Sequence, residues 1–154
     1  MLRWTAESRG DGEVVVTFEG EVTENVDFES LPHRSSEQLV LDLSGVRRLN
    51  SQGVHGFLQF LRELSEDGLI TAERCSPAII MQLNMLPSMA GLVTVRSLYV
   101  PMECDRCNLE REVLLEIPRG QRTVPALPTT RCSKCGDAMT LAEVPERYFA
   151  FLAC

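Results

Sequence analysis

The chain has 154 residues, which is long enough to form a buried core. With 44% hydrophobic and 24% charged residues, its composition is that of a folded protein and excludes disorder as the default. Its formal net charge of −7 disfavours nucleic-acid binding through the whole surface, because neutralising phosphates needs clustered cations. No segment approaches the ~18 to 20 consecutive apolar residues of a membrane helix, and the N-terminus lacks a signal-peptide layout, so we expect a cytoplasmic protein.

The first hundred residues alternate between strand-like and helix-like patterns, which predicts a mixed α/β (α+β) fold. Residues 13–20 are rich in β-branched side chains and end at a glycine, as a strand ending in a turn does. A short helical stretch is expected around residues 28–33. Residues 38–43 form a second, buried strand, and Ser44 and Gly45 are expected to mark its end.

The clearest helix follows, because five apolar residues recur at helical spacing. They are Val54, Phe57, Leu58, Leu61 and Leu64. Either Asn50 or Ser51 can cap the start of this helix, and Gly68 is expected to stop it.

The next elements are a strand over residues 69–75, a second helix and a strand over residues 93–100. Ser76 followed by Pro77 has the cap-then-proline order of a helix start. Three methionines in this region, Met81, Met85 and Met89, are interpreted as core or as flexible contact surface, not as ligands.

The C-terminal third begins only four residues after the strand that ends at residue 100. Residues 109–117 alternate charged and apolar side chains as a half-exposed strand does, residues 118–128 form a loop, and residues 138–144 are strand-like. An aromatic segment over residues 146–153 is expected to dock on the core. The predicted organisation is therefore a domain over residues 1–100, a cysteine-rich unit over 101–144, and a C-terminal segment over 145–154.

Four of the six cysteines form two CxxC pairs, and they predict one structural zinc ion. The proposed ligands are Cys104, Cys107, Cys132 and Cys135. Two disulfides or a redox CxxC are the alternatives, but a redox motif normally occurs once. Four thiolates leave no open position on the ion, so catalysis by the metal is not expected. Residues 101–144 resemble a zinc ribbon, a module that serves nucleic-acid binding, protein docking or stability alike.

A basic stretch near the second CxxC pair supports a second function, nucleic-acid binding through the ribbon. It contains Arg119, Arg122, Arg131 and Lys134 with no carboxylate among them. The competing interpretation is a solvated loop that balances an acidic protein. Because the chain is acidic and the stretch has no interleaved aromatic residues, we favour this interpretation over nucleic-acid binding.

The order of VVVTFEGEV, QLVLDLSGVRRLNSQGVHGFLQFLRELSEDG and SPAIIMQLNML resembles a STAS domain, the sulfate transporter and anti-sigma factor antagonist family. The resemblance covers about residues 1–100. It implies a mixed sheet backed by helices and a module that docks another protein, such as an anti-sigma factor kinase. It also implies a switch, the phosphorylation of a Ser or Thr in the loop before the long helix.

Carried onto this chain, the loop is Asn50, Ser51, Gln52 and Gly53. Asn50 stands where the family usually has Asp, and Ser51 matches the first hydroxyl position. Gln52 replaces the residue that is usually phosphorylated, so the usual phosphoacceptor is missing. Ser51 either substitutes for it or caps the helix.

These observations predict a non-enzymatic regulatory module that contacts a protein partner through the loop, including His55, and the exposed face of the helix. We assign no chemistry to His55 or His33, and the chain has no HExxH, GxSxG or phosphate-binding loop. The sequence leaves open whether the chain is a monomer or a homodimer. A sheet edge or the methionine-rich helix is the expected surface for self-association.

Overall fold

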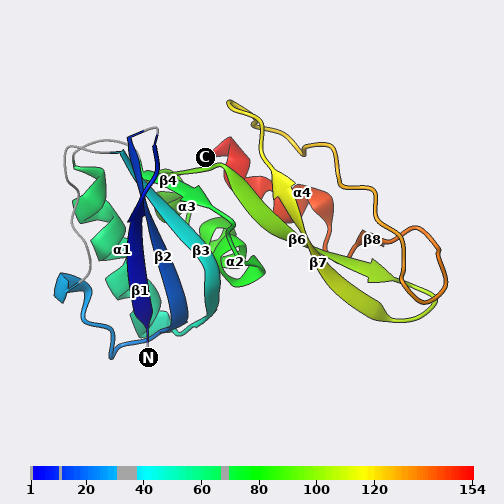
Figure 1. Cartoon of the computed structure of the whole chain (residues 1–154), viewed down its shortest axis with the longest axis horizontal. Helices are drawn as coiled ribbons and strands as arrows, with labels where there is room; N and C mark the ends of the chain where they lie inside the picture. Colours follow the sequence, from blue (N-terminus) through cyan, green and yellow to red (C-terminus); the bar gives the residue numbers. More distant parts are fainter. Residues whose placement is uncertain (1, 11, 31–37, 67–69) are drawn as a thin grey trace.

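The computed structural model describes residues 2–10, 12–30, 38–66 and 70–154, and these residues form two β-sheets. The first sheet has five strands in the order β1-β2-β3-β4-β5, and the second has three in the order β7-β6-β8. Figure 1 shows the sheets in two adjoining halves of an elongated molecule, with α1 in the first half and the C-terminal helices beside the second sheet. The predicted mixed α/β fold is confirmed.

In the five-stranded sheet, β1 pairs antiparallel with β2, and the remaining neighbours pair in parallel. Its strands are β1 (Arg3–Ser8), β2 (Glu13–Val22), β3 (Gln38–Leu49), β4 (Ile70–Glu73) and β5 (Val93–Val95). The second sheet is antiparallel and contains β6 (Ser97–Cys104), β7 (Leu109–Glu116) and β8 (Thr140–Leu141). The helices are η1 (Phe28–Ser30), α1 (Ser51–Ser65), α2 (Pro77–Met85), α3 (Pro87–Ala90), α4 (Pro145–Tyr148) and η2 (Ala150–Ala153).

Strand β3 is longer than predicted, because Ser44 and Gly45 do not end it. It continues to Leu49, with register shifts in its pairing with β2. A Cβ atom at position 45 would lie 2.5 Å from the carbonyl oxygen of Phe18. The glycine therefore allows a close approach of the two strands, which is a role other than the turn that we predicted.

The predicted strand over residues 93–100 is two strands in two different sheets. Arg96 separates them, and its backbone N–H donates to the carbonyl of Ala72 (2.8 Å) while its own carbonyl accepts from the N–H of Ile117 (2.8 Å). The sequence does not mark the residue at which the pairing partner changes, because the strands on both sides of it are largely apolar. The second sheet thus starts directly at the end of the first, and β6 crosses the predicted domain boundary at residue 100.

Other predicted elements differ in extent. The strand-like stretch over residues 138–144 contains only the two residues of β8, and β1 was not predicted. All six residues of β1 are exposed, so its sequence has no alternation of buried and exposed side chains. His33, Gly68 and Leu69 lie outside the described residues.

The first sheet and α1 share a core of aromatic rings. Phe18 of β2 meets Phe60 of α1 edge to face, with ring centroids 6.3 Å apart. Phe28 of η1 packs against Phe57 and Phe60, at centroid distances of 6.4 Å and 5.7 Å. Such contacts fix the middle of α1 to the sheet.

Helix α2 lies between the two sheets, since it contacts β3, β6 and both C-terminal helices. Its start follows the predicted cap-then-proline order: the Ser76 hydroxyl accepts from the N–H of Ile79 (3.3 Å) and donates to the carbonyl of Val46. None of the helices in the described ranges is long and apolar enough to cross a membrane.

The C-terminal segment is held on α2 by one amide side chain. Asn84 donates from Nδ2 to the carbonyl of Tyr148 (3.0 Å) and accepts at Oδ1 from the N–H of Phe151 (2.9 Å). The Tyr148 hydroxyl also donates to the carbonyl of Tyr99 in β6. The aromatic rings of Tyr148, Phe149 and Phe151 are buried in the common core.

Replacing Asn84 with alanine should lower the free energy of unfolding by about 1–3 kcal/mol, because it leaves two partly buried backbone groups unpaired. Urea unfolding measures the loss. Gln59→Ala removes an exposed amide from α1 and is the matched control, with an expected change of less than ~0.5 kcal/mol. Equal stability of the two variants would contradict this role of Asn84.

Candidate metal centre

The two CxxC segments have the same local fold. In the first, the N–H of Asn108 donates to the carbonyl of Cys104 (2.8 Å), and in the second the N–H of Gly136 donates to the carbonyl of Cys132 (2.9 Å). Asn108 and Gly136 both have left-handed backbones, with φ of 54° and 76°. Asparagine and glycine are the residues that adopt this conformation most readily, and both stand directly after the second cysteine of their pair.

Strand pairing brings the two segments together. Cys104 is the last residue of β6, and β8 pairs with β6 beside it at Met102 and Glu103. The second pair of cysteines sits in a small loop closed by a bridge between Arg131 and Ala138. The cysteines are therefore positioned by one strand and by a short irregular loop that precedes its partner β8.

The four predicted ligands, Cys104, Cys107, Cys132 and Cys135, meet at one point. Their sulfur atoms all lie within 4.8 Å of one another, and the Sγ atoms of Cys104 and Cys135 are 3.5 Å apart. A tetrahedral zinc ion with Zn–S bonds of about 2.3 Å implies S···S distances of about 3.8 Å. All six cysteines are free thiols in this structure, so it contains no disulfide. The four-cysteine cluster is positioned to bind one metal ion.

The electrostatics of the cluster favour a cation among the four cysteines. Backbone N–H groups of Cys135 and Lys134 lower the pKa of Cys132 to about 7. The hydrogen bond with Cys135 is the main cause that raises the pKa of Cys107 to about 12. Four thiols this close do not all ionise without a compensating charge, and a bound divalent ion would supply that charge.

The donor set restricts the chemistry. Four thiolates in a tetrahedron are typical of zinc or of iron–sulfur sites, and two CxxC turns suit a single zinc ion. Because all four positions around such an ion are filled by sulfur, none is left for water or substrate. The arrangement can hold the second sheet together.

The basic stretch is not brought together. Arg119 and Arg122 follow β7 near the start of β6, where Arg122 donates to the carbonyl of Ala153 (3.1 Å). Arg131 and Lys134 lie beside the cysteines at the end of β6, where Arg131 donates to the carbonyl of Gly136 (3.0 Å). The eight residues of β6 separate the two pairs by roughly 23 Å at the usual rise per strand residue.

The predicted regulatory loop is the N-terminus of α1. Of the two candidate caps, Asn50 is the one used: its Oδ1 accepts from the N–H of Gly53 (2.7 Å), and its Nδ2 donates to Glu24. Ser51, Gln52 and His55 are exposed. The Ser51 side chain makes no hydrogen bond with any residue that the structure describes.

Gly53 fixes this loop against the sheet. A Cβ atom at position 53 would lie 2.1 Å from the carbonyl oxygen of Val22, at the end of β2. The backbone N–H of Asn50 donates to that same oxygen (3.1 Å). The start of α1 therefore touches β2 backbone to backbone, which only glycine permits.

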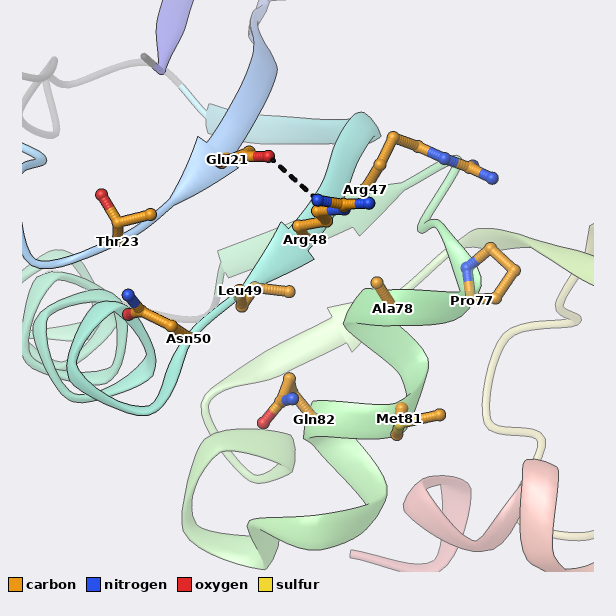
Figure 2. A pocket seen from close by; sticks show the side chains of 10 residues that line it. All are labelled: Glu21, Thr23, Arg47, Arg48, Leu49, Asn50, Pro77, Ala78, Met81 and Gln82. Atoms are coloured by element: carbon orange, nitrogen blue, oxygen red, sulfur yellow. Dashed lines mark ion pairs between the residues drawn. The ribbon is translucent and has the colours of Figure 1, made fainter.

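A groove beside the loop was not predicted from the sequence. It has a volume of about 610 Å³ and lies between the end of β3 and the start of α2 (Figure 2). Its lining residues are Glu21, Thr23, Arg47, Arg48, Leu49, Asn50, Pro77, Ala78, Met81 and Gln82. These come from separate stretches of the chain, so no local motif marks the groove.

No protein-family model matches the chain, and no curated protein matches it. The mixed sheet and the four-cysteine cluster are therefore established by the structure itself. The resemblance to a STAS domain rests on the residues quoted for it.

Proposed function

We propose that this chain is a non-enzymatic, regulatory protein-docking module of the anti-sigma factor antagonist type, stabilised by one zinc ion in the four-cysteine cluster. The observation that carries the proposal is the exposure of Ser51, Gln52 and His55 on the first turns of α1, where the predicted loop lies and where the helix start is firmly anchored. This arrangement presents polar side chains without any partner within the described chain that would compete for them.

The anchoring of the loop supports docking. The contact of Gly53 with Val22 and the cap by Asn50 fix the backbone before any partner arrives. A preorganised surface loses less conformational entropy on binding than a mobile one. Rigid presentation is thus consistent with a recognition surface.

The position of Ser51 supports a phosphorylation switch. Because Asn50 is the cap, the Ser51 hydroxyl is not needed to satisfy the helix end. A phosphate at this first position of the 15-residue helix would be favoured by the helix dipole and would add up to about two negative charges to the docking surface. Ser51 thereby offers a phosphorylation site in place of the Ser or Thr that the STAS family usually has at the position of Gln52.

The metal site supports a structural role for the second sheet. A closed set of four thiolates offers no position for substrate, and β8 and the loop before it contain little regular structure of their own. Zinc would hold this half of the molecule in shape and keep β7 and β6 paired. It is a stabiliser of the module in this proposal and takes no part in a reaction.

The test is affinity capture from native extract, with the partner identified by mass spectrometry and zinc content measured in parallel. We expect Ser51→Ala/Gln52→Ala/His55→Ala to lose the partner while keeping zinc and thermal stability. Glu110→Ala/Glu116→Ala alters exposed side chains of β7 in the other sheet, and this control should keep the partner. Recovery of the same proteins by both variants would refute docking through the loop.

A further inference from the structure

The outward side of α2 is uncharged and carries protruding methionines. Ala78, Met81, Gln82 and Met85 follow one another at helical spacing and form one stripe. Met81 is 57% exposed and Met85 is 65% exposed. The sequence contains no charged residue from position 75 to position 95, although charged residues make up 24% of the chain. A helix that is apolar on its exposed side as well as its buried side is typical of an interface.

The stripe forms one wall of the groove, because Ala78, Met81 and Gln82 line it and only Met85 lies outside. Figure 2 shows α2 and the end of β3 as two walls, with Leu49 and Ala78 between them and Met81 on the helix beside them. Protruding side chains and a hollow that can receive them therefore occupy the same face. Methionine suits such a contact because its unbranched side chain adapts to irregular surfaces.

A protrusion beside a hollow is what a two-fold symmetric dimer requires. In such a dimer the same patch serves both copies, so it must be complementary to itself. We propose that two copies of this chain associate through α2, with the methionine stripe of each copy seated in the groove between β3 and α2 of the other.

Opposite charges at the rim make this patch complementary to the same patch on a second copy of the chain. With a net charge of −7, two copies repel each other over most of their surface, and the uncharged stripe avoids that repulsion. The rim of the groove carries both positive and negative charge. The Nη1 atom of Arg48 lies 3.7 Å from the Oε1 atom of Glu21, and both side chains are exposed. Two such rims facing each other can exchange these ion pairs between the copies.

This inference is independent of the proposed docking through the loop, because its test needs only the purified, zinc-loaded chain. Light scattering after size exclusion, over low-micromolar to near-millimolar concentrations, should give the mass of a dimer for the wild type. Met81→Glu should weaken self-association roughly tenfold or more, since it buries a charge without a partner. Leu114→Glu alters a side chain on β7 that is 44% exposed, and this control should remain dimeric.

A charge exchange at the rim gives a second test with variants that alter only exposed side chains. Arg48→Glu alone and Glu21→Arg alone should each dimerise less than the wild type, because like charges then face each other. A mixture of the two variants should recover the dimer. A wild type that stays monomeric would overturn the proposal, as would a dimer indifferent to Met81→Glu or a mixture that shows no recovery.

Discussion

Cys104→Ser is expected to abolish metal binding and to melt the three-stranded sheet, the largest loss of stability that we expect from one substitution in this chain. Metal binding to comparable structural sites is worth roughly 10–16 kcal/mol in isolated zinc-finger peptides. Cys104 and Cys132 are also buried in the common core, so loss of the ion would expose the apolar residues around them. The loop from residue 118 to 139 has no regular element to keep it in place.

Zinc content by mass spectrometry and thermal unfolding by circular dichroism measure this prediction. Cys154→Ser is the control, because Cys154 is exposed and takes no part in the cluster. It should keep one zinc ion per chain and the wild-type melting temperature. A Cys104→Ser protein that retains one tightly bound ion and melts like the control would show that the cluster does not stabilise the fold.

Gly53→Ala is expected to lower the free energy of unfolding by about 3 kcal/mol or more, the upper end of what overpacking costs. The added Cβ atom would lie 2.1 Å from the carbonyl oxygen of Val22, and the nearest atoms are all backbone. No side-chain rotation can relieve the clash, so α1 must move away from β2. That movement would also displace the loop before it.

The control for Gly53→Ala is Gly91→Ala. A Cβ atom at position 91 would meet its nearest neighbour, the carbonyl oxygen of Pro87, at an ordinary 3.6 Å. Chemical denaturation should show little change for Gly91→Ala and a large one for Gly53→Ala. Equal stability of both variants would contradict the close backbone contact between Gly53 of α1 and Val22 of β2.

Sequence patterns predicted the elements whose signals are local. Helix α1 was found from the spacing of its apolar residues, α2 from Ser76 and Pro77, and the metal ligands from two CxxC motifs. In each case the residues that decide the structure lie within a few positions of one another.

Features that depend on distant contacts could not be predicted in this way. The division of residues 93–100 between two sheets depends on pairing with Ala72 and Ile117, which lie far away in the chain. The groove joins separate stretches. The four cations of the basic stretch are close in sequence, but they form two pairs that lie at opposite ends of β6.

The direct continuation of β5 in one sheet into β6 in the other bears on how this protein can be divided. A fragment ending at residue 100 would stop in the middle of β6, whose second half pairs with β7 and β8. It would also lack the C-terminal aromatic residues that cover α2. The cysteine-rich half is therefore not a unit that can be exchanged by itself. Recombination that transfers it to another protein must also transfer α2 and the strand before α2. Otherwise the apolar core residues of both pieces are exposed to solvent.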